Sequence, residues 1–159
     1  MALWTVYLSL GLLVALNASV ETRPVEKNKH CGTCETGWTA FGCRCFNFYN
    51  NLQIWSSAEK YCLIYGGNLA SVYSHDEYMF IKNLIRRTTH ASTRTWIGLH
   101  HVADYIYWFW SDGTSMNYQI WSPGEPSYSK DEYCVEMNSV NGNWNDANCK
   151  EEKPFVCVK

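Results

Sequence analysis

The chain has 159 residues, with 13 Lys and Arg against 15 Asp and Glu, which gives a formal net charge of -2. This length is typical of a single domain. A balance so close to neutral indicates neither a nucleic-acid partner nor binding to an anionic membrane, because both need clustered basic residues.

The first 19 residues (1–19) predict a secretory signal peptide. A largely apolar run over residues 8–16 is followed by the small residues Ala18 and Ser19, and it is too short to span a bilayer. A buried helix is the alternative. We therefore expect a secreted, extracellular protein, with residues 20–30 as a polar, flexible lead-in and residues 31–159 as one domain.

Eight cysteines follow the predicted leader, an even number in a chain that we expect to be exported. Oxidising compartments favour disulfides, so the sequence predicts four bridges. The clustered pairs Cys31-x-x-Cys34 and Cys43-x-Cys45 also fit a four-thiolate zinc site. That alternative would need a reducing compartment, which the leader argues against.

A first helix is predicted to begin at Ser56. Ser56 and Glu59 have the spacing of a capping box, in which each side chain accepts a hydrogen bond from the backbone N–H of the other residue. Apolar and aromatic residues then recur at helical spacing as far as Gly66 and Gly67, which supply a stop.

A second helix is predicted to begin at Ser74, which has the same spacing to Glu77. Four large residues follow on one helical face, namely Tyr78, Ile81, Leu84 and Ile85. Arg86 and Arg87 come next, where the C-terminus of a helix favours cations.

Beyond residue 95 short apolar runs alternate with Gly, Asn, Ser and Pro, and this pattern predicts strands. The runs cover residues 96–99, 105–110, 134–137 and 155–157, with a polar loop region at 111–131. Helices followed by strands indicate an α+β domain rather than a doubly wound parallel one. The aromatic residues 107–110 are predicted to pack in the core, with ligand stacking as the alternative.

Several motifs stand in a fixed order along the chain. They are Cys34-x3-Trp38-x6-Cys45, Cys62, Asn68-Leu69-Ala70-Ser71, Trp96-Ile97-Gly98-Leu99, Pro123-Gly124-Glu125-Pro126, Cys134, Trp144-Asn145-Asp146, Cys149 and Phe155-Val156-Cys157. This order resembles the C-type lectin domain over residues 34–159, and most closely the small soluble lectins of fish, whose relatives include type II antifreeze proteins. The resemblance implies a disulfide-stapled α+β domain with two helices, antiparallel strands and a long loop region.

The resemblance also implies a disulfide pairing, which sequence alone would not fix. It joins Cys34 with Cys45 in an N-terminal hairpin, Cys62 with Cys157, and Cys134 with Cys149. Cys31 and Cys43 lie outside the common set of the family. We expect them to pair with each other, and a link between two chains is the alternative.

By the same resemblance one calcium ion is held by Glu125, Glu132, Asn145 and Asp146, with Ser127 as a further candidate. These residues supply the oxygen atoms that calcium requires. The resemblance implies a cis bond between Glu125 and Pro126, and open coordination positions that two adjacent sugar hydroxyls fill. The alternative is an acidic loop that binds nothing.

One residue departs from the family pattern. Mannose-type members read Glu-Pro-Asn and galactose-type members Gln-Pro-Asp, whereas this chain has Glu125-Pro126-Ser127. A serine hydroxyl offers one donor where an amide offers two, so a contact to the ion and a contact to the sugar are both weakened. Glu125 weakly favours mannose-like or fucose-like sugars. Tyr128 and Tyr133 stand where auxiliary calcium ligands would be, which predicts a single ion.

The leading prediction is a secreted calcium-dependent lectin that binds glycans, with a role in innate immune recognition. An ice-binding antifreeze protein is the second, although its known members carry an additional bridge and this chain has only Cys134 and Cys149 between residues 63 and 156. A calcium-free domain that binds protein is the third, suggested by Ser127.

We predict no enzymatic activity. The histidines have no spacing that suggests a metal site or a catalytic triad; they are His30, His75, His90, His100 and His101. A homo-oligomer would strengthen a weak sugar site through avidity, but no collagen-like or coiled-coil segment is present in the sequence to build one.

Overall fold

The computed structural model describes residues 31–102 and 107–159. The predicted signal peptide and polar lead-in lie outside the described residues. The elements in chain order are β1 (Thr39–Phe41), β2 (Arg44–Gln53), α1 (Trp55–Ile64), β3 (Asn68–Leu69), α2 (His75–Thr89), β4 (Thr95–His100), β5 (Phe109–Trp110), β6 (Glu132–Met137), the short 3-10 helix η1 (Val140–Gly142), β7 (Asn145–Asn148) and β8 (Lys153–Val158). None of the helices in this described part is long and apolar enough to cross a membrane.

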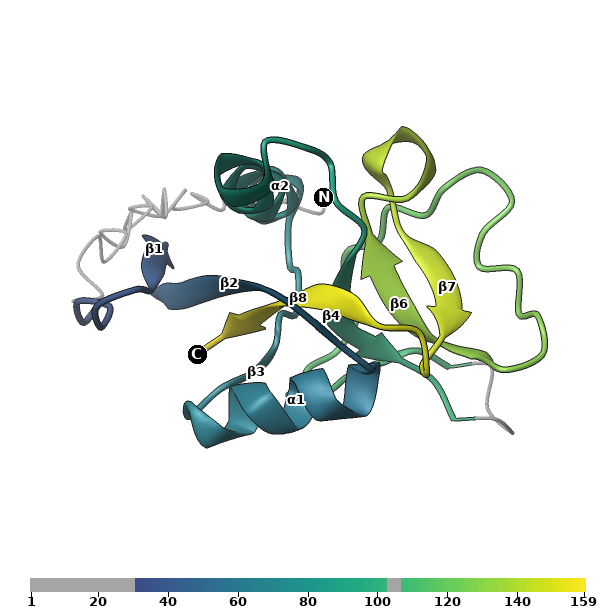
Figure 1. The fold of residues 1–159 in the computed structure, drawn as a ribbon, viewed down its shortest axis with the longest axis horizontal. Coiled ribbons are helices and arrows are strands. Elements are labelled where there is room, and N and C mark those ends of the chain that lie inside the picture. Colours follow the sequence, from purple (N-terminus) through teal and green to yellow (C-terminus); the bar gives the residue numbers. More distant parts are fainter. Residues whose placement is uncertain (1–30, 103–106) are drawn as a thin grey trace, which may run out of the picture.

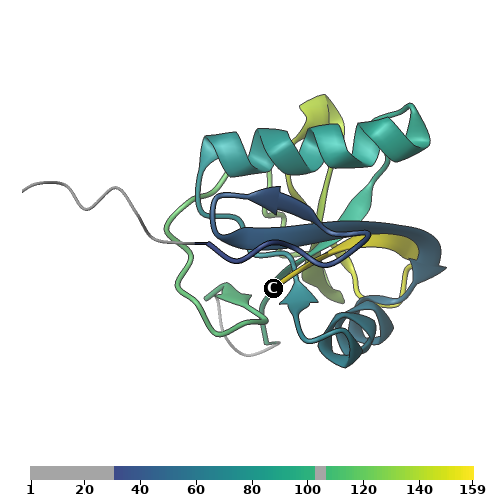
Figure 2. The same ribbon diagram turned by 90° about the vertical axis from the view of Figure 1, so that its left-hand side faces the viewer.

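One sheet organises the domain, with the strand order β1-β2-β8-β4-β6-β7, β3 paired to β8 and β5 paired to β4. The two helices lie on opposite sides of this sheet, α1 on one side and α2 on the other (Figures 1 and 2). The predicted α+β class is confirmed. The strands are antiparallel except for β4 and β8, which pair in parallel through Trp96 and Phe155, so the sheet is mixed.

Each helix covers its own apolar cluster. On the α2 side Ile81 and Ile85 belong to a fully buried group that includes Trp110 and Trp144. On the α1 side Ala58 belongs to a second buried group with Trp96 and Phe155, among others. The tryptophans of the first cluster lie beneath the long loop, residues 111–131, and support it.

The predicted N-cap of the first helix, Ser56, is wrong by two residues. α1 begins at Trp55 after Ile54, which makes no side-chain cap. Glu59 does not reach back to Ser56; its carboxylate accepts hydrogen bonds from the backbone N–H of Leu69 at 2.7 Å and from Asn68 Nδ2 at 2.6 Å. A tertiary contact to β3 has therefore replaced the local cap. The predicted stop holds, since Gly67 N–H donates to Cys62 O.

Glu59→Ala is expected to lower the free energy of unfolding by about 1.5–3 kcal/mol, because a buried backbone N–H and an amide would lose a charged acceptor. Urea unfolding of the intact protein measures this loss. Lys60→Ala, at the exposed neighbouring position, is the matched control and should change stability by less than about 0.5 kcal/mol. Equal effects of the two variants would contradict the role given to Glu59.

The second helix begins as predicted, since Ser74 Oγ accepts a hydrogen bond from Glu77 N–H at 3.2 Å. The carboxylate of Glu77 accepts instead from Tyr73 N–H at 2.7 Å and pairs with Arg44 of β2. Arg86 lies in the last turn, as expected for a cation, and the helix ends at Thr89. α2 is thus tied to the sheet at its N-terminus.

Three of the four predicted strands are observed, within β4, β6 and β8. The fourth run, 105–110, is a strand only at Phe109 and Trp110, and its first two residues lie outside the described part. Core packing is correct for Trp110, which is 1% exposed, but wrong for Tyr107 and Phe109, which are 65% and 46% exposed. Alternation along the chain turns Phe109 to the face opposite Trp110.

Four disulfides join all eight cysteines; three are the pairs that the resemblance implied, and the fourth is the pair expected outside the common set. Cys31 bonds to Cys43 within the chain, so neither a link between two chains nor a four-thiolate zinc site is formed by these residues. Cys62 of α1 is joined to Cys157 of β8, and Cys134 of β6 to Cys149 just after β7. The last bridge fixes the two strands that carry three of the predicted calcium ligands.

Candidate functional site

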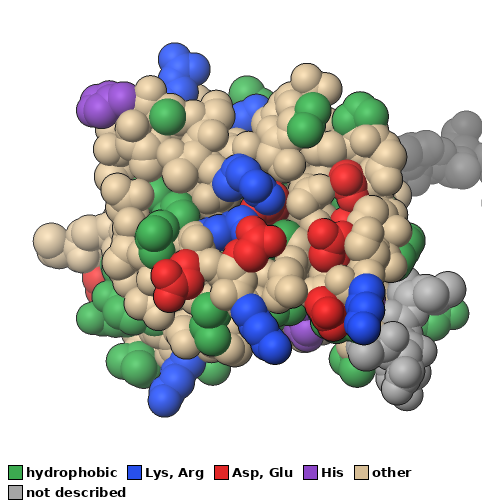
Figure 3. All heavy atoms as spheres, turned by 45° about the vertical axis from the view of Figure 1, so that its right-hand side comes forward, with side chains coloured by type: hydrophobic (Ala, Val, Ile, Leu, Met, Phe, Trp, Pro, Cys, Tyr) green, Lys and Arg blue, Asp and Glu red, His purple; other side chains and the backbone are tan. Residues whose placement is uncertain are grey.

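The long loop is held by backbone hydrogen bonds to Trp144, the residue immediately before β7. Ser122 N–H donates to Trp144 O at 2.8 Å, and Trp144 N–H donates to Ile120 O at 2.9 Å. The Trp144 side chain is fully buried beneath the loop. Figure 3 shows acidic side chains gathered on the face of the molecule that carries this loop, with Lys and Arg beside them.

Glu125 stands at the turn of the loop, and its bond to Pro126 is cis, as the resemblance implies. Its Oε2 atom is buried and has no hydrogen-bond partner among the described residues. Burial raises the pKa of the Glu125 carboxyl to about 6, and contact with the Asp146 carboxyl, by hydrogen bonding and charge repulsion, is the next cause. An oxygen atom in this position is suited to a cation.

Asp146 of β7 holds the loop in place from below. Its side chain is buried, with the residue 1% exposed, and its two carboxylate oxygens accept hydrogen bonds from Ser127 N–H at 2.9 Å and Tyr128 N–H at 2.8 Å. The N–H groups of the two residues that follow Pro126 are thereby directed at the carboxylate. Two predicted ligands, Glu125 and Asp146, are brought together by this arrangement.

Ser127 and Glu132 form a second pair. Ser127 Oγ donates to Glu132 Oε2 at 2.7 Å, across the loop to the first residue of β6. The same hydroxyl lies 2.8 Å from Ser129 Oγ. The departure at position 127 therefore has a visible consequence, because the shorter side chain is turned toward Glu132 and Ser129.

Asn145 points toward its own strand neighbour and toward β6. Its Nδ2 atom lies 2.6 Å from the backbone oxygen of Asp146 and 3.2 Å from Glu136 Oε1. The amide is thus next to one predicted ligand atom, the Asp146 carbonyl. No contact joins it to Glu125 or Glu132 in the described part of the chain.

Glu136 is a residue of the site that the sequence analysis missed. It is fully buried, accepts a hydrogen bond from Arg94 Nε at 2.7 Å, and lies 3.2 Å from Lys153 Nζ. Buried carboxylates persist only when they are paired in this way. The available signal was a charge inside the apolar run of β6. Glu136 fixes the amide of Asn145 from behind.

The donor set fits a hard cation, since it offers only oxygen atoms, from three carboxylates, an amide, a hydroxyl and a main-chain carbonyl. The unpaired and buried Glu125 Oε2 is the structural observation in favour. Within residues 31–102 and 107–159, however, no three His, Cys, Asp or Glu side chains gather closely enough to surround a metal ion. Glu125 and Asp146 form one acidic pair, and Glu132 is joined to Ser127 instead.

His101, at the first position after β4, packs among aromatic rings at the rim of the site. The residue is 8% exposed, and Trp108, Tyr128 and Tyr133 surround its ring with centroid distances of 4.5, 6.0 and 5.1 Å. Tyr128 and Tyr133, expected to replace auxiliary calcium ligands, therefore form a wall around this imidazole.

A sequence family described as Lectin C-type domain matches residues 51–159. Over 157 residues the chain is 38% identical to the galactose-specific lectin nattectin of Thalassophryne nattereri, covering 98% of this chain and 95% of nattectin. Over 141 residues it is 38% identical to ladderlectin of Oncorhynchus mykiss, covering 87% of this chain and 74% of ladderlectin.

Solved structures with the same fold include two type II antifreeze proteins that differ in their use of calcium. A Ca2+-dependent one, in its Ca2+-free form, is 35% identical, with a TM-score of 0.74 and coverage of 79% of this chain and 99% of its own. A calcium-independent one is 32% identical, with a TM-score of 0.74 and coverage of 83% and 98%. The same scaffold thus occurs with and without dependence on the ion.

Proposed function

The chain belongs to the C-type lectin domain family, and from this membership we propose that it is a secreted, calcium-dependent protein that binds carbohydrate. One observation carries the proposal beyond the family. The carboxylate of Asp146 holds the loop by the N–H groups of Ser127 and Tyr128, and this places the buried, unpaired Glu125 Oε2 beside it. Carboxylates kept together at such a point favour a cation between them.

Five residues would hold the ion in this proposal: Glu125, Ser127, Glu132, Asn145 and Asp146. Bound calcium supplies open coordination positions that two adjacent sugar hydroxyls can fill. The remaining lone pairs of Glu125 and Glu132 would accept hydrogen bonds from the same hydroxyls, and the Asn145 amide would offer its oxygen to the ion while its Nδ2 stays bonded to Asp146 O and Glu136 Oε1. Glu136, paired with Arg94 and Lys153, keeps that amide oriented.

For the sugar class we propose mannose-like or fucose-like rings, on the strength of Glu125. Nattectin, the relative described above, is named a galactose-specific lectin, so galactose is the competing outcome. Recognition of microbial surfaces in innate immunity is the biological role that follows from either.

The test passes the mature, oxidised protein over mannose, fucose and galactose resins in calcium and elutes with a chelator. Retention on one resin and release by the chelator support the proposal, and the resin identifies the sugar. Retention that the chelator leaves untouched contradicts the calcium-dependent mechanism. A protein that no resin retains contradicts sugar binding at this site.

Ice binding is the second candidate, favoured by the likeness to the two type II antifreeze structures. Thermal hysteresis of the same sample, measured with and without calcium, tests it. Thermal hysteresis without retention on any resin would indicate that the protein binds ice rather than sugar. A calcium-free, protein-binding domain remains the third, and heat or stabilisation on titration with calcium would contradict it.

Ser127→Asn is expected to tighten calcium binding about tenfold, equivalent to ~1.4 kcal/mol. The amide adds an oxygen ligand for the ion and keeps a donor toward Glu132, which the Ser127 hydroxyl now contacts at 2.7 Å. Isothermal titration with calcium measures the change. Ser92→Asn, at an exposed serine between α2 and β4, is the control and should leave the affinity unchanged. A weaker site in Ser127→Asn would refute the assignment of position 127.

A further inference from the structure

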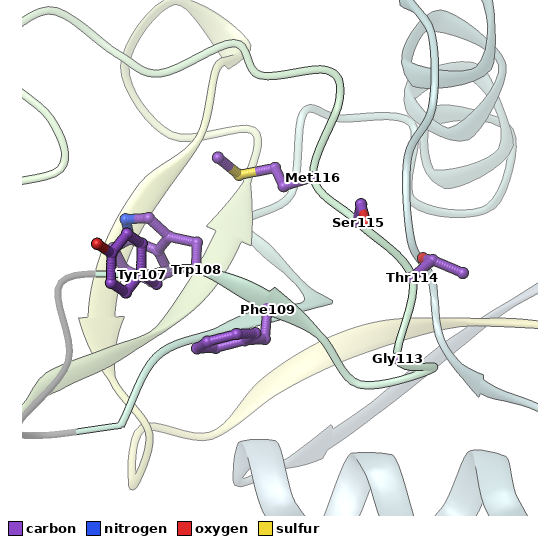
Figure 4. Close-up of a pocket in the computed structure, with 7 residues that line it drawn as sticks. All are labelled: Tyr107, Trp108, Phe109, Gly113, Thr114, Ser115 and Met116. Atoms are coloured by element: carbon purple, nitrogen blue, oxygen red, sulfur yellow. The ribbon is translucent and has the colours of Figure 1, made fainter.

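A cavity of about 620 Å³ opens beside the long loop and is unexplained by the proposed calcium site. Its walls come from the segment that enters β5 and from the segment that leaves it (Figure 4). The lining includes Tyr107, Trp108 and Phe109 on one side and Thr114, Ser115 and Met116 on the other. In Figure 4 the Met116 side chain extends toward the rings of Tyr107 and Trp108.

The chemistry of the lining selects a neutral ligand with both apolar and polar faces. Tyr107 and Phe109 are 65% and 46% exposed, so their rings face solvent rather than the core. No described residue of the lining carries a charge. The Ser115 hydroxyl makes no hydrogen bond to another described residue and is free for a ligand. A hexose ring has such faces, with C–H groups that pack on aromatic rings and hydroxyls at its edge.

Trp108 connects this cavity to the loop that carries the proposed site. It is half-buried, its ring lies 5.0 Å from that of Trp121, and its Nε1 donates to Tyr128 OH at 3.4 Å. Tyr128 in turn donates its backbone N–H to Asp146 at 2.8 Å. Tyr128 therefore links Trp108 of the aromatic cavity to the carboxylate that anchors the site.

We propose that the cavity binds a further sugar ring of the same glycan whose terminal ring is held at the calcium site. The proposal rests on the proposed function, and it adds that oligosaccharides are preferred over monosaccharides. The second contact follows the first within one ligand, so it needs no additional bimolecular encounter and raises the overall affinity. Tyr107 and Phe109 supply the stacking surface, and Ser115 supplies a hydrogen bond.

Calorimetric titration of the oxidised protein in calcium tests this with two ligands, methyl α-mannoside and a linear mannotriose. If the resin test selects galactose, methyl galactoside and a galactotriose replace them. We expect the trisaccharide to bind wild type about tenfold more tightly than the monosaccharide, from one added stacking contact and hydrogen bond. Tyr107→Ala with Phe109→Ala should remove most of that ratio and leave the monosaccharide affinity unchanged. Both positions are exposed, so folding is preserved.

Tyr65→Ala is the matched control, because Tyr65 is an aromatic residue of similar exposure, 47%, at the end of α1. It should keep the preference for the trisaccharide. Equal affinities of wild type for both ligands, or a preference that survives in the double variant, would overturn the proposal.

Saturation-transfer NMR separates a failure of the cavity from a failure of the calcium site. Irradiation of aromatic protons should transfer saturation to the trisaccharide in wild type, and still do so in Asp146→Ala at a high ligand concentration, but not when Tyr107→Ala and Phe109→Ala are added to Asp146→Ala. If wild type shows no transfer, the cavity proposal is wrong, whether or not the resin test succeeds. If transfer persists without any effect of calcium, only the proposed function fails.

Discussion

Asp146→Ala is expected to abolish retention on sugar resins and to remove the stabilisation that calcium gives the protein. The carboxylate is lost as a ligand, and the N–H groups of Ser127 and Tyr128 lose their acceptor at the same time. Calcium at a hundredfold excess over its Kd raises the free energy of unfolding by about 2.7 kcal/mol through binding to the native state. In the variant this increment should fall to near zero, as measured by thermal unfolding with and without calcium.

A second effect of Asp146→Ala is independent of the ion. Two hydrogen bonds to a buried carboxylate disappear, so the calcium-free variant should be less stable than the calcium-free wild type by about 1.5–3 kcal/mol. Separating the two effects needs the full set of four unfolding curves. A variant that loses stability but still gains the normal increment from calcium would show that Asp146 anchors the loop without ligating the ion.

Asp131→Asn is the matched control for charge. Asp131 is an exposed acid of the same loop, is not a proposed ligand, and has a φ of 70°, which asparagine tolerates. Its replacement should leave retention and calcium stabilisation as in wild type. If both variants lose binding to the same degree, the acidic loop acts as a diffuse negative surface and the specific site is misplaced.

Much of the fold could be predicted from local sequence pattern, and the predictions that failed did so for physical reasons. The apolar runs of β4, β6 and β8 are central strands, buried on both faces, which is why they stand out in the sequence. β2 was missed because it mixes polar residues with Phe46 and Phe48, although their alternation at period two was an available signal. Glu59 does not cap its helix because its carboxylate bonds to Leu69 of β3, a tertiary partner that the local sequence pattern does not reveal.

The site was predictable to the extent that the family resemblance supplied it. Spacing along the chain gave no reason to bring Glu125 beside Asp146, because the loop is held there by two N–H contacts to Asp146 between residues far apart in the sequence. The role of Glu136 could not be predicted for the same reason, since its partners Arg94 and Lys153 come from other strands or their flanks. Buried ion pairs depend on tertiary contacts that no local period encodes.

Removing the two long-range disulfides one at a time is expected to show that the bridge with the larger effect on stability has the smaller effect on calcium affinity. Cys62 and Cys157 close a loop of 95 residues, and the chain-entropy relation assigns that bridge about 4–5 kcal/mol. Cys134 and Cys149 close a loop of only 15 residues, for which the same relation gives about 3 kcal/mol. Replacing each pair by two alanines and unfolding in urea measures both values.

Calcium affinity should follow the opposite order, because only the shorter bridge holds the strands of the proposed site. Cys134 lies two residues from Glu132, and Cys149 follows β7, which begins with Asn145 and Asp146. The Cys134→Ala, Cys149→Ala variant is therefore expected to bind calcium about tenfold more weakly, equivalent to ~1.4 kcal/mol. The Cys62→Ala, Cys157→Ala variant, measured well below its melting temperature, should bind as wild type does, because its bridge ties α1 to β8 and is attached to neither β6 nor β7. The reverse order of affinities would place the ion away from β6 and β7, and the proposed ligands with it.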